Sequence, residues 1–235
     1  GYKIVSSSQE ATIALINTCT VTENGDADTR RLVRKLVLDN STIQIALIGC
    51  QSQVHKDELL SLPNVKWVVG NHEKMNVHHI IDQTLSMPGQ VLKTDKIKRE
   101  PFKISSSSID THHTRANIKI QDGCDFYCSF CVIPFARGPA RSRVFEDIIR
   151  ECIDLGHAGH QEIVITGINV GTYDYEGKTL LDVINAISAI DLIKRIRISS
   201  IEPTTIPKAL IESMNSNPKL CRYLHIPVQS ACNPM

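Results

Sequence analysis

The stretch "QDGCDFYCSFCVIPFARGPARSR", Gln121 to Arg143, carries the most distinctive chemistry of the sequence. Its cysteines, Cys124, Cys128 and Cys131, lie within eight residues on a polar loop that follows the strand-like run "NIKIQ". Thiolates are soft ligands that suit iron-sulfur clusters and zinc, and three on one tight loop can hold three corners of a cubane. The fourth iron would stay open, which favours a site that binds a substrate or a cofactor.

A structural zinc site is the competing interpretation of these cysteines. Structural zinc usually has four closed ligands, often arranged as two Cys-x2-4-Cys pairs, and the second pair is absent here. Buried free thiols are a further alternative, but the polar residues of this loop argue against it. The spacing therefore favours a cluster with one open position.

Short β-branched runs alternate with helical patterns along the chain, which predicts an α/β fold with parallel sheets. We predict one domain over residues 1–86, a linker over 87–115 with a loop-like composition, and a second domain over 116–235. The first domain should hold strands at "TIALINT", "TIQIALIG" and "VKWVVG", and an amphipathic helix around residues 30–37. A further helix is expected over residues 74–85.

The second domain shows the same alternation, with expected strands at "NIKIQ", "EIVITG", "RIRISS" and "YLHIPV". Gly156 should end the first helix between these strands, and Thr179 with Asp182 should form a capping box at the second. Four βα units of roughly 30 residues each predict part of a (βα) barrel with its chemistry at the carboxyl ends of the strands. Because four strands cannot close a barrel, we expect more chain. The start at Gly1 without a methionine and the stop at "CNPM" lead us to expect truncation at both ends.

Composition limits the classes of function. The 26 basic and 25 acidic residues give a formal charge of +1, so nucleic-acid binding would have to be local. The apolar runs are much shorter than the roughly 18 to 20 residues that span a bilayer, and no leader pattern opens the chain. We therefore predict a cytoplasmic protein without a membrane partner.

The pattern Cys-x3-Cys-x-aromatic-Cys, with Phe130 as the aromatic residue, resembles the radical S-adenosylmethionine (SAM) superfamily. The longer string "KIQDGCDFYCSFCVIPFARGPARSR" resembles its methylthiotransferase family, and "LINTCTVTENGDADTRR" and "IGCQSQ" resemble the amino-terminal domain of that family. The resemblance covers nearly the whole chain. It implies an incomplete amino-terminal methylthiotransferase domain followed by an incomplete radical SAM barrel.

Two 4Fe-4S clusters are implied by the resemblance. Cys124, Cys128 and Cys131 would bind the first, whose open iron is chelated by SAM. The second is held in the family by three cysteines, of which two match Cys19 and Cys50, and the third is expected upstream of Gly1. Both cysteines follow apolar strands and so should share one edge of a sheet, although a cysteine at such a position is otherwise often packing.

The resemblance also implies cofactor contacts and reaction partners. Phe130 would lie near the adenine of SAM, and Gly167 in "TGINVG" near its methionine amino group, although this glycine also suits a strand-to-helix turn. One SAM supplies the methyl group and another the radical that abstracts hydrogen. An electron donor and a sulfur donor are therefore expected partners.

The strings "VITGINVGTYDYEG" and "RISSIEPTTIP" resemble the branch that methylthiolates N6-threonylcarbamoyladenosine at tRNA position 37. Glu202 marks this branch and is a candidate substrate contact, or a simple loop carboxylate. Arg137, Arg141 and Arg143 form an acid-free run where anticodon-loop phosphates can bind, or a solvated face. The alternatives are the same chemistry on isopentenyladenosine or a ribosomal-protein aspartate, and a non-catalytic, metal-stabilised fragment.

Overall fold

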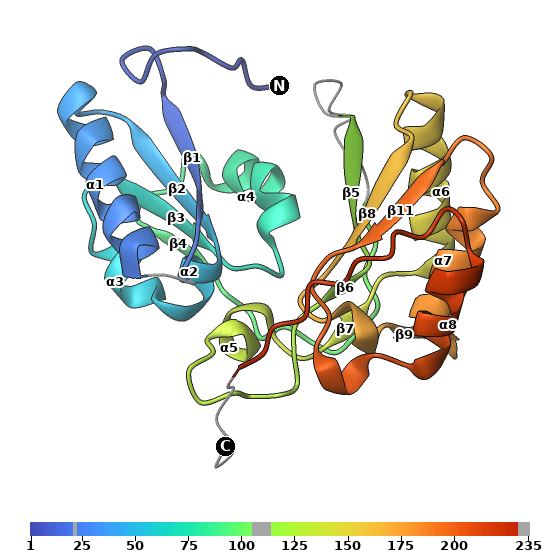
Figure 1. The fold of residues 1–235 in the computed structure, drawn as a ribbon. Coiled ribbons are helices and arrows are strands. Elements are labelled where there is room, and N and C mark those ends of the chain that lie inside the picture. The colour runs from blue at the N-terminus through green and yellow to red at the C-terminus, as the bar shows by residue number, and fades with distance from the viewer. Residues whose placement is uncertain (21–22, 105–113, 230–235) are drawn as a thin grey trace. The chain divides into compact units, whose positions relative to one another are not determined.

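A computed structural model describes residues 1–20, 23–104 and 114–229 (Figure 1). The chain divides into two compact units, Gly1–Lys98 with Phe126–Gly138, and Arg99–Asp125 with Pro139–Met235. These boundaries differ from the predicted ones. The first unit includes residues 87–98 of the expected linker and the segment that contains Cys128 and Cys131.

A four-stranded parallel sheet of order β1-β2-β3-β4 forms the centre of the first unit. Its strands are β1 (Ile13–Thr18), β2 (Gln44–Gly49), β3 (Val65–Val69) and β4 (Val91–Lys93). The first three were predicted, whereas β4 lies in the segment that we expected to be a linker. Thr18 pairs with Gly49, so β1 and β2 end at the same level.

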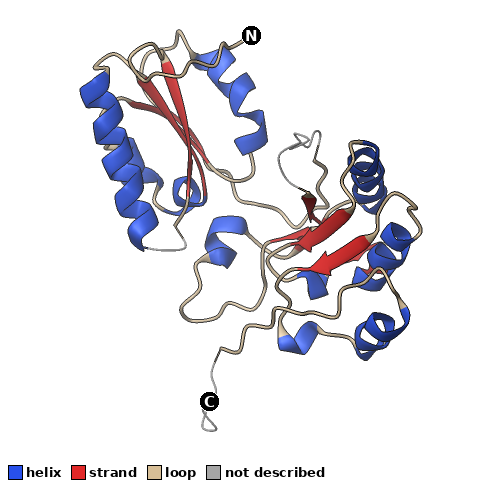
Figure 2. Ribbon diagram, turned by 45° about the horizontal axis from the view of Figure 1, so that its top comes forward, coloured by secondary structure: helices blue, strands red, loops and turns tan. Residues whose placement is uncertain are grey.

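Helices cover both faces of this sheet (Figure 2). Ile45 and Leu47 of β2 pack in one core cluster with Val33 of α1, while Ala46 packs in another with Ile80 of α4. This alternation is the period of a strand buried on both sides. The helices are α1 (Glu23–Asp39), α2 (Cys50–Val54), α3 (Lys56–Leu60), the 3-10 helix η1 (Lys74–Asn76), α4 (Val77–Thr84) and α5 (Ile133–Arg137).

The second unit has a three-stranded parallel sheet of order β11-β8-β5. Its strands are β5 (Arg115–Lys119), β8 (Glu162–Thr166) and β11 (Arg195–Ile198). Alternate strand residues such as Ile163 and Ile196 enter one core cluster together with residues of α6, α7 and α8. The remaining elements are β6 (Gln121–Asp122), β7 (Arg141–Ser142), α6 (Phe145–His157), η2 (Val170–Thr172), β9 (Asp174–Tyr175), β10 (Lys178–Thr179), α7 (Leu180–Ser188), η3 (Pro203–Thr205) and α8 (Lys208–Ser216).

Three expectations about this unit are corrected. "YLHIPV" is not a strand: it makes one isolated bridge, Ser200 to His225, and Pro227 has no N–H to donate to a ladder. The predicted linker is partly built into the fold, because the backbone of Phe102 pairs beside Arg143, while residues 105–113 lie outside the described part. Gly156 does not end its helix, since α6 continues to His157.

Two other features have simple outcomes. The capping box predicted at α7 is confirmed, because the backbone N–H and the hydroxyl of Thr179 both donate to Asp182, at 2.7 and 2.8 Å. Within the described ranges, the helices are too short or too polar for any of them to cross a membrane.

Candidate functional site

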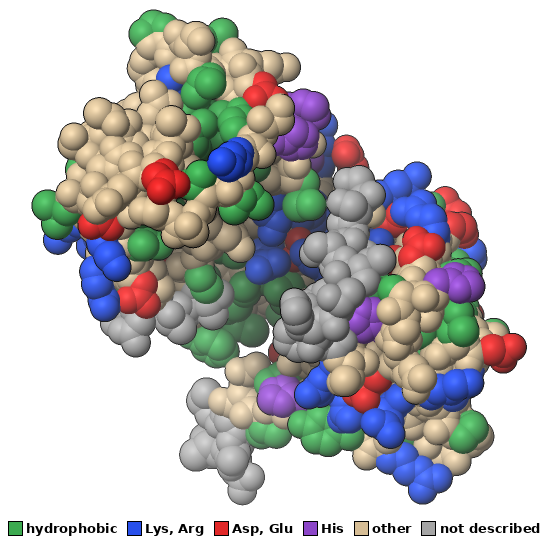
Figure 3. Space-filling view, turned by 90° about the horizontal axis from the view of Figure 1, so that it is seen from above, with side chains coloured by type: hydrophobic (Ala, Val, Ile, Leu, Met, Phe, Trp, Pro, Cys, Tyr) green, Lys and Arg blue, Asp and Glu red, His purple; other side chains and the backbone are tan. Residues whose placement is uncertain are grey.

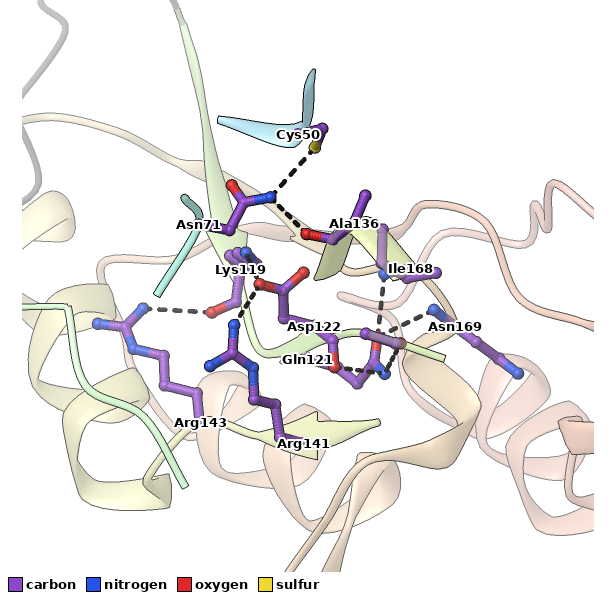
Figure 4. A network of polar contacts seen from close by, with 11 residues as sticks. Cys50, Asn71, Lys119, Gln121, Asp122, Ala136, Arg141, Arg143, Ile168 and Asn169 are labelled. Carbon is purple, nitrogen blue, oxygen red and sulfur yellow. Dashed lines mark hydrogen bonds and ion pairs between the residues drawn. The ribbon is translucent and has the colours of Figure 1, made fainter. Parts of the chain in front are cut away.

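The carboxyl ends of β5 and β8 are joined by the side chain of Gln121, which is fully buried (Figure 4). Its Oε1 accepts hydrogen bonds from the backbone N–H groups of Ile168 and Asn169, both at 2.9 Å. Its Nε2 donates to the carbonyl oxygens of Asp122 and Gly123, at 3.2 and 2.8 Å. One amide therefore fixes the loop that enters Cys124 against the loop that leaves β8.

Asn169 extends this network to the loop after β11. Its Oδ1 accepts from the Thr205 hydroxyl at 2.9 Å and from the backbone N–H of Glu202 at 3.4 Å. The Nδ2 of Asn169 is buried and has no hydrogen-bond partner among the described residues. Polar side chains thus connect the ends of all three strands and leave one buried amide nitrogen for a group that the described residues do not supply.

Gly167 is required by close packing at this edge. A Cβ atom there would lie 3.0 Å from both Gln121 Oε1 and Val170 Cγ1, which is tighter than ordinary contact. Gly171 is more crowded, with the Thr205 hydroxyl 2.3 Å from the position of a Cβ. Close packing is therefore one reason for glycine at position 167. The cofactor contact of Gly167 stays a prediction.

The cysteine loop begins where Gly123 turns the chain with a φ of 74°. Cys124, Cys128 and Cys131 form no disulfide among the described residues and are partly exposed, and the N–H of Cys131 donates to the Cys128 carbonyl at 2.9 Å. Among the residues described, no three His, Cys, Asp or Glu side chains are gathered as a metal site. Cys124 belongs to the second compact unit and the other two cysteines to the first.

The donor set nevertheless fits a cluster that binds a cofactor. Three thiols in the pattern Cys-x3-Cys-x2-Cys are suitable soft ligands, and Phe130, directly before Cys131, is 73% exposed, so its ring can stack on a cofactor. Asp125, which follows Cys124, is held by two hydrogen bonds from Arg99, at 2.8 and 2.9 Å. The hydrogen bond from Arg99 lowers the pKa of Asp125, so this carboxylate is anionic at neutral pH.

Cys19 and Cys50 follow residues that are paired across β1 and β2, Thr18 and Gly49. The Thr18 hydroxyl donates to the Ile48 carbonyl at 2.8 Å and fixes the two strand ends together. Gly49 has a φ of 105°, and a Cβ there would lie 2.6 Å from the Thr18 carbonyl oxygen. The two cysteines are therefore neighbours at one sheet edge, as the sequence predicts, with Cys19 exposed and Cys50 buried.

Gln51, the residue after Cys50, has a buried side-chain amide without a partner among the described residues. Gln51 is fully buried, and neither its Oε1 nor its Nε2 has a partner within the described part of the chain. Leaving such groups unsatisfied costs about 1–3 kcal/mol each. Two thiols that directly follow paired strand ends are a suitable donor set for a second cluster, to which Cys19 and Cys50 would contribute two ligands.

The predicted arginine patch requires a correction. Arg143 is fully buried, with its Nε 2.6 Å from Asp147 and its Nη1 paired with Glu151. Arg141 pairs with Asp122 at 3.1 Å, and its side chain is 11% exposed. Asp122, before the run, neutralises Arg141, and Asp147 and Glu151, after it, neutralise Arg143. Arg143 is therefore a structural residue that a phosphate cannot reach.

The two other predicted substrate contacts remain accessible. Arg137 is the last residue of α5 and is partly exposed, and Glu202 is partly exposed directly before η3. On the face shown in Figure 3, Lys and Arg side chains are interspersed with Asp and Glu. That face therefore presents no single basic surface.

Sequence reasoning missed Gln121 and Asn169 in the second unit and Asn71 in the first, amides that fix loops near the candidate cysteines. The available signal was their position, because each directly follows or closely follows an apolar strand. Asn and Gln side chains that bind backbone groups follow no characteristic sequence pattern. Their hydrogen-bond partners could be identified only from the structure.

Comparisons with known proteins agree with this architecture. The profile of the Radical SAM superfamily matches residues 118–233, and that of the uncharacterized protein family UPF0004 matches residues 1–70. A solved radical SAM methyltransferase, TsrM from Kitasatospora setae, aligns with a TM-score of 0.65 at 13% identity, over 95% of this chain and 49% of that one. The fold and the cysteine loop thus define a radical SAM protein.

The curated relatives narrow the family. The chain is 37% identical to the threonylcarbamoyladenosine tRNA methylthiotransferase MtaB of Bacillus subtilis, over 99% of this chain and 52% of that protein. It is 32% identical to the tRNA-2-methylthio-N(6)-dimethylallyladenosine synthase of Cereibacter sphaeroides, over 98% of this chain and 53% of that protein. The chain belongs to the radical SAM methylthiotransferase family, and it spans about half the length of the curated relatives it matches.

Proposed function

We propose that this protein is an enzyme that converts N6-threonylcarbamoyladenosine at tRNA position 37 to its 2-methylthio derivative. The observation that carries the proposal is the 37% identity to MtaB of Bacillus subtilis over 99% of the chain, cysteine loop included. MtaB proteins of Chlamydia pneumoniae and Thermotoga maritima, each 35% identical, support the same substrate. We propose a cytoplasmic reaction, because the proposed substrate is a tRNA.

Cys124, Cys128 and Cys131 would hold a 4Fe-4S cluster, and SAM would bind beside it. When bound, this pair supplies a low-potential electron and a carbon radical able to abstract hydrogen from an aromatic C–H. Phe130 would stack on the adenine, and the loop at Gly167 would receive the methionine amino group. Gln121 joins the segment directly before Cys124 to the loop after β8, because its amide bonds to both.

Cys19 and Cys50 would hold a second 4Fe-4S cluster that carries the sulfur to be inserted. This assignment is supported by their adjacent positions at the ends of β1 and β2. An electron donor and a sulfur donor are needed as partners, and the anticodon loop of tRNA would be read with Arg137 and Glu202 among its contacts. Single-stranded RNA is commonly bound through such edge and phosphate contacts.

Mass spectrometry of tRNA nucleosides from cells that lack the gene tests the substrate. The methylthio group should be lost from threonylcarbamoyladenosine and return when the full-length gene is restored, but not with the Cys128→Ala variant. Loss from the dimethylallyl nucleoside instead would assign the alternative tRNA substrate. Unchanged tRNA nucleosides, with one zinc and no iron after anaerobic reconstitution, would refute the enzyme.

A further inference from the structure

Asn71 contacts two elements that bear on the predicted clusters. Its Nδ2 lies 3.4 Å from the Cys50 sulfur and 2.7 Å from the Ala136 carbonyl oxygen, and all three residues belong to the first unit (Figure 4). A carbonyl oxygen can only accept, so the amide nitrogen must face Ala136. The second N–H of the same nitrogen is then available for the sulfur.

The position of Asn71 is fixed by the chain around it. The backbone N–H of Asn71 donates to Gln53 Oε1 at 3.2 Å, and Gln53 Nε2 reaches the carbonyls of Thr94 and Asp95, both at 3.3 Å. A Cβ at Gly70 would lie 2.1 Å from Gln53 Oε1, so glycine is needed for this approach. Asn71 is itself 7% exposed, and its rotamer is therefore held on both sides.

Stability alone does not account for an amide at this position. Asn71 Oδ1 is buried without a partner among the described residues, and an unsatisfied acceptor is costly compared with an apolar side chain of the same shape. What the amide offers here is its donor side. Both donors are used, one on a sulfur and one on the backbone of α5.

We propose that Asn71 is a positioning residue for the second cluster, an inference that rests on the proposed function. Its N–H donates to the Cys50 thiolate when that sulfur ligates iron, and the same amide anchors α5, which begins two residues after Cys131. Hydrogen bonds to ligand sulfurs stabilise the more negative, reduced cluster and so raise its reduction potential. One side chain thus sets the potential of one cluster and the position of the loop that carries the other.

The test uses full-length protein with Cys124, Cys128 and Cys131 changed to Ala, so that only the second cluster is reconstituted. In this background, Asn71→Leu should lower the midpoint potential at unchanged iron content, and Asn71→Asp should lower it further by adding negative charge. Asn76→Leu is the matched control, because the exposed Asn76 side-chain amide donates, among the described residues, only to Glu73 Oε2, at 3.1 Å. Its potential should equal that of the parent protein.

Hydrogen exchange of the α5 amides in the cluster-free protein gives an independent measurement. Loss of one hydrogen bond should speed their exchange about fivefold in Asn71→Leu and leave it unchanged in Asn76→Leu. Equal potentials in Asn71→Leu and the parent, with iron bound in both, would overturn the inference alone. A parent protein that binds no iron would overturn the two-cluster function and the inference together.

Discussion

Replacing Arg143 by Gln should strongly destabilise the second unit. The guanidinium is fully buried and contacts the carboxylates of Asp147 and Glu151, which are 2% and 8% exposed. Removing one partner of a buried ion pair leaves the other charge uncompensated and costs about 3–5 kcal/mol. We expect a loss of that size in the free energy of unfolding.

Urea unfolding followed by circular dichroism measures this effect, and Arg150→Gln is the matched control. Arg150 also pairs with Asp147, but from the surface, with a side chain that is 61% exposed, so its loss should cost less than about 1 kcal/mol. The reasoning is refuted if Arg143→Gln costs no more than Arg150→Gln. In that case Arg143 could instead contact a tRNA phosphate. Arg143→Gln would then bind tRNA more weakly, and its affinity would depend less steeply on salt concentration.

The pH dependence of the unfolding free energy is a second test of the Arg143–Asp147 ion pair. Burial acts to raise the pKa of Asp147, but hydrogen bonds from Ile104 and Arg143 and the charges of Arg143 and Arg150 outweigh it and hold the pKa below its usual value. A depressed folded-state pKa gives stability that is complete above the unfolded pKa, about 3.9, and is lost as pH falls through the folded value. Unfolding free energies of wild type and Arg143→Gln should therefore converge below about pH 4.

Other positions give equally direct outcomes. Gly49→Ala should cost about 1–3 kcal/mol in unfolding free energy and reduce the iron bound at the amino-terminal cysteines, because the φ of 105° and the Thr18 carbonyl exclude a Cβ. Burial raises the pKa of Cys152 to about 12, so mass spectrometry should find it unalkylated by iodoacetamide at pH 8 in the folded protein, whereas the exposed Cys19 reacts. Thr179→Ala should lose about 1 kcal/mol of unfolding free energy through the capping box of α7. Gln121→Leu should leave the backbone groups at Asp122, Gly123, Ile168 and Asn169 unsatisfied, costing several kcal/mol and weakening SAM binding in a calorimetric titration.

Hydrophobic period and caps were sufficient to predict most of the α/β elements. The three long strands of the first sheet lie at the predicted runs, and α7 begins at its predicted capping box, because buried faces and caps impose a pattern that the sequence must keep. β4 was missed, since its three residues include two that are exposed and it is stabilised by pairing with β3. A short strand that is stabilised by pairing with a neighbouring strand has little hydrophobic pattern of its own, so its sequence does not predict it.

Two predictions from local sequence were wrong: the helix end at Gly156 and the exposed position of Arg143. Gly156 has the composition of a helix end, but the structure uses it for close packing, because a Cβ there would lie 2.8 Å from the Leu192 side chain. The chain turns later, at Gly159, with a φ of 98°. Arg143 stands in a run without acids, and its partners lie four and eight residues further on, one and two turns along α6.

Amide side chains and neutralised ion pairs hold the loops at the strand ends, and this affects the reduction potential of a cluster bound there. Gln121, Asn169, Gln53 and Asn71 bind backbone N–H and C=O groups and bring no net charge with them. A fixed cation beside a thiolate-ligated cluster would raise its reduction potential, which opposes the low potential that reductive SAM cleavage needs. The arginines near the cysteine loop follow the same rule, since Arg99, Arg141 and Arg143 each pair with a carboxylate. Neutral amides and neutralised arginines therefore hold these loops in place without adding a net positive charge beside the cysteine loop. The N–H that Asn71 directs at Cys50 acts on the other proposed cluster.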